Sequence, residues 1–184
     1  MNFSEKIPKK FSRPIMKFIC NMVYGILASK SCLLSEIGRN LNEKILLHKT
    51  VTRLSRNLND FNGGKVLFEE YLKAIKNRYD KKSVLIIDGF DITRPASTKL
   101  EALCEVRDGS TGEIGIGYHT IGAAVLSDRK LPYSVYSRIY SSREKNFISE
   151  DDETLKCFSF LSSHFSKSNI RTMDRGYNCN KYYE

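Results

Sequence analysis

The sequence predicts an α/β protein in which an all-helical, basic domain, residues 1–80, precedes a sheet-forming domain, residues 81–184. Apolar residues recur at three- and four-residue steps in the first part, as in amphipathic helices, whereas short runs of branched apolar residues follow residue 83. Residues 1–80 contain 15 Lys and Arg against 7 Asp and Glu, and residues 81–184 contain 15 against 14. The net charge of +9 therefore comes mainly from the first domain, and the polar segment 80–82 is the expected boundary.

The composition excludes several classes of protein. With 41% hydrophobic and 28% charged residues and no low-complexity tract, the chain can form real cores and is not disordered in bulk. Its 5 cysteines have neither zinc-site nor redox spacing, which indicates free thiols in a reducing cytoplasm. The apolar stretch 15–28 is interrupted by Lys17 and Asn21 and is too short to span a membrane, so we expect no membrane partner.

Four helices are expected in the basic domain. The first covers Ile15 to Ala28 and is expected to supply the core. The second begins at Ser31 as N-cap and continues to Leu41. The third runs from Leu46 to Leu58, and the last from Val66 to Tyr79 after the break at 62–64.

The third of these helices has two different faces. Val51, Leu54 and Leu58 share one face, whereas Lys49, Arg53 and Arg56 share another. Two short helices, the second with a basic outer face, are similar to a helix-turn-helix arrangement, whose second helix can lie in a major groove or along phosphates. DNA contact by these three cations is one interpretation, and ordinary solvated charge is the other.

The second domain is expected to contain four strands and one helix. The helix is opened by the acidic segment 149–153, which suits the positive end of a helix dipole. Its expected apolar face consists of Leu155, Phe158, Leu161 and Phe165. The expected strands are 84–87, ended by Asp88-Gly89, then 114–126, 131–140 and 170–173.

Asp88 and Asp174 each come directly after an expected apolar strand. If those strands are neighbours in one sheet, both carboxylates emerge at the same edge and can share a metal ion. Carboxylate oxygens select Mg²⁺ or Mn²⁺, and such ions support in-line phosphoryl transfer. The alternative is that both are ordinary turn residues at strand ends.

Several segments of the chain are similar to insertion-sequence transposases of the DDE class, in the broad group called IS-four. The resemblance covers most of residues 30–184, and its most specific part is the Asp-Arg-Gly-Tyr block. The segments are 84–92 (VLIIDGFDI), 103–110 (LCEVRDGS), 115–118 (GIGY), 131–141 (LPYSVYSRIYS) and 173–178 (MDRGYN).

The resemblance implies an RNase H-like catalytic domain in which Asp88 and Asp174 are the first two catalytic, metal-binding acids, with Mg²⁺ or Mn²⁺ as cofactor. Arg175 and Tyr177 flank the second acid and are expected to touch DNA. Members of this family cut DNA at element ends and join the freed 3′ ends to a target. Their synaptic mechanism implies pairing of two copies, and the expected location is the bacterial cytoplasm, at the nucleoid.

The family's third acid is a glutamate on a helix well downstream of the second aspartate. This chain stops ten residues after Asp174, so Glu184 lies too close to be that acid, and Arg143-Glu144-Lys145 precedes the second aspartate. We therefore expect the N-terminal fragment of a transposase with a truncated RNase H-like domain. The alternatives are a catalytically dead transposase that acts only by binding DNA, and an inert remnant.

Three other polar residues receive structural interpretations. Asp91 is expected to face solvent or cap a turn, with a supporting role beside Asp88 as the alternative. Asp108 precedes Gly109 and is expected in a turn. His119 stands alone in a strand and is expected to be a satisfied structural histidine.

Overall fold

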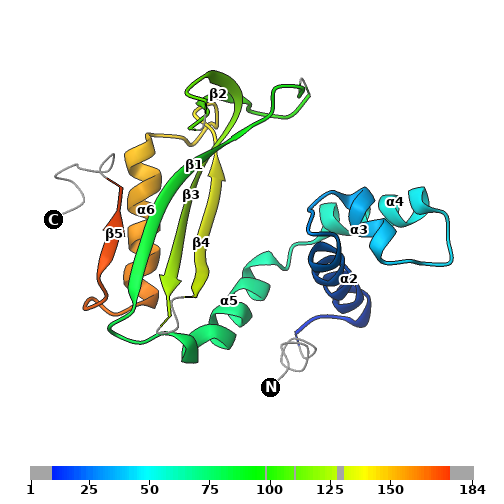
Figure 1. Ribbon diagram of the computed structural model, residues 1–184, viewed down its shortest axis with the longest axis horizontal. Helices are drawn as coiled ribbons and strands as arrows, with labels where there is room; N and C mark the ends of the chain where they lie inside the picture. The colour runs from blue at the N-terminus through cyan, green and yellow to red at the C-terminus, as the bar shows by residue number, and fades with distance from the viewer. Residues whose placement is uncertain (1–9, 98, 110, 128–130, 175–184) are drawn as a thin grey trace. The chain divides into compact units, whose positions relative to one another are not determined.

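The computed structural model describes residues 10–97, 99–109, 111–127 and 131–174 (Figure 1). The chain divides into two compact units, Met1–Ala74 and Ile75–Glu184, and each is described by itself. No single helix in the described ranges is long and apolar enough to cross a membrane, although the bent pair Arg13–Ser29 and Leu34–Asn40 would pass by combined length and composition.

The first unit is built from helices α2 (Arg13–Ser29), α3 (Leu34–Asn40), α4 (Leu47–Asp60) and α5 (Gly64–Ile75), with α5 ending at the boundary between the units. Pro14 stands in the first turn of α2, where a missing N–H is harmless. The core of the unit brings together side chains from α2, α3 and α4, as the apolar periodicity requires. The buried core residues are Phe18, Ile19, Ile37 and Leu54.

Two glycines let these helices approach closely. A Cβ atom on Gly25 of α2 would stand 2.4 Å from Cγ2 of Ile37, and one on Gly38 of α3 would stand 3.1 Å from Cδ1 of Leu47. Larger residues would therefore push α2 and α4 away from α3, which lies against both (Figure 1).

The helix starts differ from the sequence prediction at two places. Ser31 is not the N-cap of α3; its hydroxyl accepts a hydrogen bond from the Leu33 N–H at 3.1 Å, and Leu33 occupies the cap position. The helix α5 begins at Gly64 instead of Val66, because the Gly63 carbonyl already accepts the Leu67 N–H at 2.9 Å. In the first case a local serine turn replaces the expected cap.

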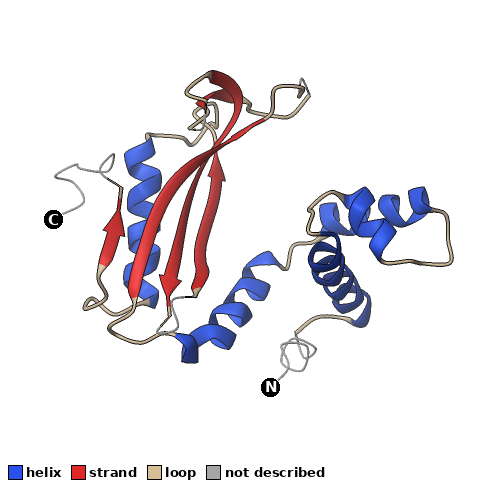
Figure 2. Ribbon diagram, in the orientation of Figure 1, coloured by secondary structure: helices blue, strands red, loops and turns tan. Residues whose placement is uncertain are grey.

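The second unit is a mixed sheet with one long helix (Figure 2). The central strand β3 pairs antiparallel with β1 along one edge, and with β2 and then β4 along the other. The short strand β5 extends the sheet on the far side of β1, to which it runs parallel. The elements are β1 (Val84–Thr93), β2 (Cys104–Arg107), β3 (Ile114–Leu126), β4 (Pro132–Tyr140), α6 (Glu150–His164) and β5 (Arg171–Met173), preceded by the 3₁₀ turn η1 (Lys76–Arg78).

The strand β1 is longer than the prediction of 84–87. Asp88 pairs with Gly122 and Gly89 with Ile121, so the ladder continues through the residues that were expected to end the strand. Pairing with the long strand β3 overrides the turn preference of an Asp-Gly sequence. The strand β2 was not predicted at all, because four residues give too short a pattern to be recognised.

The helix α6 packs on one face of the sheet. Its N-cap Ser149 accepts a hydrogen bond from the Asp152 N–H at 3.1 Å, ahead of the acidic first turn. Cys157 and Leu161 are buried, whereas Leu155 is 39% exposed, so the predicted apolar face was wrong at that position. The packed face also contains a charged group, the carboxylate of Glu153.

Glu153 is 1% exposed and is held by two cations. Arg138 of β4 donates to it, and Nζ of Lys156 lies 2.7 Å from its Oε1. Burial by itself would raise the pKa of Glu153, but the hydrogen bonds from Arg138 and Lys156 outweigh it, and the pKa is lowered. This ion pair ties α6 to β4.

The opposite face of the sheet is not covered by any helix of the described part of the second unit. Ile86, Phe90 and Ile139 lie on this face by strand alternation and register, and they are 38%, 53% and 56% exposed. The face nevertheless carries one of the two predicted catalytic acids.

Candidate functional site

The parallel pair of strands β1 and β5 brings the two predicted catalytic acids together. Ile87 of β1 is in register with Met173 of β5, and Asp88 and Asp174 are the next residues along each strand. A shallow hollow of about 320 Å³ contains both acids (Figure 1 shows the two strands side by side). It is lined by Ile86, Ile87, Asp88, Thr172, Met173 and Asp174.

Strand alternation decides which face of the sheet Asp88 occupies. Leu85 and Ile87 are buried beneath α6, so Asp88 between Ile87 and Gly89 lies on the opposite, uncovered face and is exposed. Thr172 and Asp174 are likewise exposed, whereas Met173 between them is half-buried. Both acids are therefore exposed to solvent at this end of the strand pair.

The chemistry of this acid pair fits a hard divalent cation. Mg²⁺ is commonly held by one or two carboxylates together with waters and substrate phosphates, so two acids are a sufficient protein contribution. Within the described ranges, no group of three His, Cys, Asp or Glu side chains converges on one point. Asp88 and Asp174 would hold the ion, with no further acid from the described part of the chain.

Asp91 does not belong to this pair. It lies three residues after Asp88 and therefore on the opposite face, where its Oδ1 is 2.9 Å from Nδ1 of His119, its partner across the strands. The imidazole of His119 stacks on the ring of Tyr140 at a centroid distance of 5.6 Å. This arrangement agrees with the structural role expected for His119, and it replaces the expectation that Asp91 faces solvent or caps a turn.

Asp108 is a turn residue, as predicted. Its Oδ1 accepts a hydrogen bond from the Thr111 N–H at 3.3 Å, and its carbonyl oxygen accepts one from the Gly112 N–H at 2.7 Å. Gly112 has a φ of +74°, which suits a glycine in a tight turn. Asp108 therefore stabilises the connection between β2 and β3.

The predicted DNA-binding residues of α4 fall into two groups. Lys49 and Arg56 are exposed, and neither has an ion-pair partner in the described part of the chain. Arg53 instead points to Glu43, with Nη2 2.6 Å from Oε2, and both side chains are largely covered. Arg175, the fourth predicted DNA contact, and Tyr177 lie outside the described residues.

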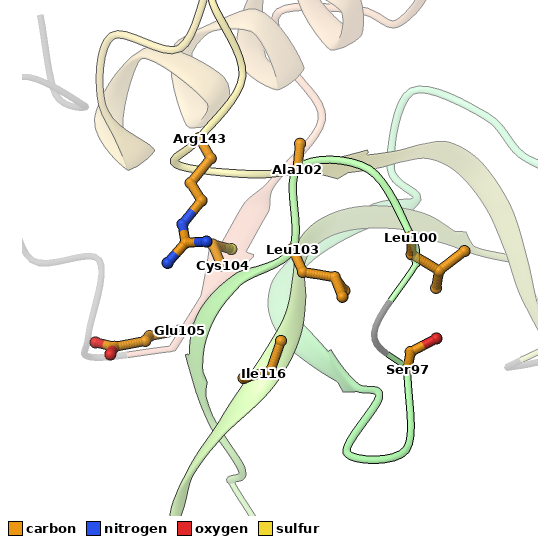
Figure 3. Close-up of a pocket in the computed structure, with 8 residues that line it drawn as sticks. All are labelled: Ser97, Leu100, Ala102, Leu103, Cys104, Glu105, Ile116 and Arg143. Carbon is orange, nitrogen blue, oxygen red and sulfur yellow. The ribbon is translucent and has the colours of Figure 1, made fainter.

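A larger hollow, of about 490 Å³, lies in another part of the sheet unit and was not predicted (Figure 3). Residues from the connection between β1 and β2, from β2 and β3, and from the segment after β4 form its walls. No sequence motif joins these positions, and most of the lining is apolar. The lining residues are Ser97, Leu100, Ala102, Leu103, Cys104, Glu105, Ile116 and Arg143.

Comparison of the chain with protein-family models, with curated proteins and with solved structures finds no match. The geometry itself defines an α/β protein with a pair of exposed acids at the end of a parallel strand pair and a helical unit with an exposed cationic helix.

Proposed function

We propose that the chain is part of a DDE transposase, with an RNase H-like sheet unit that acts on DNA phosphodiesters and a helical unit that binds DNA. The observation that carries the proposal is the juxtaposition of Asp88 and Asp174 at the end of the β1–β5 pairing. The strand order supports it: four strands in antiparallel pairings, a helix, and then a parallel strand beside β1.

The two acids would act by holding a divalent metal ion. Mg²⁺ or Mn²⁺ bound there would neutralise phosphate charge and help to generate a nucleophilic oxygen. Asp88 and Asp174 would supply the negative oxygens that hold the ion. Asp88 lies within β1 and Asp174 directly follows the last residue of β5, so the pairing of the two strands positions both backbones. A rigid placement of this kind suits in-line phosphoryl transfer, in which positioning and charge neutralisation do most of the work.

The helical unit would supply affinity for DNA. The helices α3 and α4 are joined by a short turn, and the exposed cations Lys49 and Arg56 extend from the second helix. In a helix-turn-helix arrangement the second helix is the one that approaches the major groove. The proposed partners are transposon ends and target DNA, in a complex that pairs two copies of the chain, at the bacterial nucleoid.

The acid pair can be tested by iron-directed cleavage of the polypeptide. Fe²⁺ bound in place of Mg²⁺, with ascorbate and peroxide, should cut the chain near both 88 and 174, and excess Mg²⁺ should suppress both cuts. Asp88→Asn should remove the cuts at both places, because they come from one ion. Cuts at only one place, or cuts that persist in Asp88→Asn, would contradict a shared site.

A second candidate function is DNA binding without catalysis. It is favoured by the exposed cations Lys49 and Arg56 of α4 in a basic unit, which do not depend on the acid pair. A DNA-binding chain whose affinity falls steeply with salt, and which shows no Fe²⁺-directed cuts, would support this function over the first.

A further inference from the structure

One exposed side of α4, directly opposite its buried side, is a polar strip. At 3.6 residues per turn, six exposed positions fall within about 120° of arc. Thr50 and Leu54, which are 2% and 0% exposed, mark the buried side. The strip consists of His48, Lys49, Thr52, Ser55, Arg56 and Asn59, and we call it the α4 strip.

The α4 strip has the chemistry of a surface that faces a polyanion. It carries two cations, Lys49 and Arg56, and no acid of its own; the single acid of α4, Asp60, is exposed at the C-terminal end of the helix. Its other side chains are an imidazole, hydroxyls and an amide, which can donate hydrogen bonds to phosphate oxygens and base edges. Arg53 lies beyond the edge of the strip, toward the buried side.

Arg53 is engaged within the protein. Its Nη2 lies 2.6 Å from the Glu43 carboxylate, which also accepts a hydrogen bond from the hydroxyl of Thr50 at 2.9 Å. The Arg53 Nε is buried and has no hydrogen-bond partner among the residues that the structure describes. The charge of Arg53 is therefore balanced by Glu43, and its side chain is drawn inward instead of toward a ligand.

Glu43 lies in the connection between α3 and α4, so this clasp of Glu43, Thr50 and Arg53 fixes how α4 leaves the turn. The adjacent Asn42 has a φ of +46°, a left-handed conformation that reverses the chain there. A clasp across a turn restricts the orientation of the helix that follows it, and with it the direction of the α4 strip.

We infer that Lys49 and Arg56 are the phosphate-binding cations of the α4 strip, and that Arg53 is a positioning residue that orients α4 through Glu43 without touching DNA. The inference rests on the proposed DNA binding. It assigns different roles to three cations that share one helix.

The test measures binding of the full chain to a fluorescein-labelled 30-bp duplex of mixed sequence over a series of salt concentrations. The logarithm of the association constant K falls linearly with the logarithm of the salt concentration. Each lost phosphate contact should make this fall less steep by about 0.9, which is about an eight-fold loss of affinity at 0.1 M salt. We expect this change in Lys49→Ala and in Arg56→Ala. Lys17→Ala is the matched control, since Lys17 is exposed on α2 and off the strip, and it should bind like the unchanged chain.

The clasp is tested by exchanging its charges. Glu43→Arg and Arg53→Glu should each weaken binding, and the double variant, which restores the pair, should recover both the affinity and the salt slope of the unchanged chain. Two results would make Arg53 a DNA contact and overturn the inference. One is a double variant that binds as weakly as Arg53→Glu; the other is a salt dependence that becomes less steep by about 0.9 in Arg53→Gln. Circular dichroism checks that each variant is helical. If a charge-reversal variant unfolds the unit, the salt dependence of Arg53→Gln still tests the role of Arg53.

The two proposals fail in different ways. If the unchanged chain shows no salt-dependent binding to the duplex, the proposed DNA binding is wrong and the inference falls with it. If the unchanged chain binds but Lys49→Ala and Arg56→Ala match the Lys17→Ala control, the DNA-binding proposal stands and the role of the α4 strip is wrong.

Discussion

Asp88 and Asp174 are adjacent because Ile87 and Met173, the residues that precede them, are in register on the parallel strands β1 and β5. The two acids are far apart in sequence, yet they line one hollow. The two acids come together only if β5 pairs with the edge of β1. Because β5 is parallel to β1, the chain must first cross the sheet, and α6 makes this crossing while it covers one face. The packing of α6 is therefore a condition for the candidate site.

The buried Glu153 should make the second unit sensitive to acid. Because its pKa is lowered in the folded state, the stabilisation is fully present above the ordinary glutamate pKa of 4.5 and is lost as the pH falls through the lower folded value. Thermal melts should show the unit losing stability below about pH 4.5. Glu153→Gln should lower its free energy of unfolding at pH 7 by about 1–3 kcal/mol and flatten the acid dependence.

Glu113→Gln is the control for this prediction, since Glu113 is exposed and no ion pair is found for it in the described part of the chain. Its effect should stay within about 0.5 kcal/mol at every pH. Equal acid dependence in Glu153→Gln and in the unchanged chain would show that Glu153 is not the group responsible.

The close approach of α2 and α3 should make Gly25 intolerant of a larger residue. In Gly25→Ala the new methyl group would meet Ile37 Cγ2, and we expect the first unit to lose about 1–3 kcal/mol in spite of the higher helix propensity of alanine. Gly64→Ala is the matched control, because a Cβ there meets nothing within 4 Å. Urea titrations of both variants measure the difference, and equal stability of the two would refute the close contact.

The cysteines should react in two classes. Cys20 and Cys32 are exposed, whereas Cys104 and Cys157 are buried, and burial raises the pKa of the Cys157 thiol to about 12. In a Cys179→Ser background, an aromatic disulfide reagent at pH 8 should modify Cys20 and Cys32 rapidly and the other pair only after denaturation. Rapid modification of all four thiols in the native chain would contradict the packing of α6 and β2.

Much of the fold was predictable, because strong periodicity marks the long elements. The helices α2 and α4 and the strands β3 and β4 match their predicted ranges closely. The sequence misplaced features that tertiary contacts decide: Asp88 continues β1 because β3 pairs with it, and Leu155 stays exposed because Glu153 and Cys157 turn toward the sheet. Local propensity carries no information about such partners.

The candidate site was likewise predictable only where it did not depend on tertiary partners. Asp88 and Asp174 were identified from their positions after apolar runs, and the register places them together. Arg53 was grouped with Lys49 and Arg56 because helical spacing cannot reveal the Glu43 side chain that engages it. The pairing of Asp91 with His119 was missed because it depends on the register of β1 and β3, which the local pattern of either strand alone does not reveal.

Binding of Mn²⁺ to the chain, counted by electron paramagnetic resonance, tests the shared metal site most directly. The unchanged chain should bind one ion that Mg²⁺ displaces, and Asp88→Asn and Asp174→Asn should each weaken that binding by about 10–100-fold. Glu105→Gln, which removes an exposed acid on β2, should leave it unchanged. Undiminished Mn²⁺ binding in both aspartate variants would contradict the metal site, and with it the proposed phosphoryl-transfer chemistry.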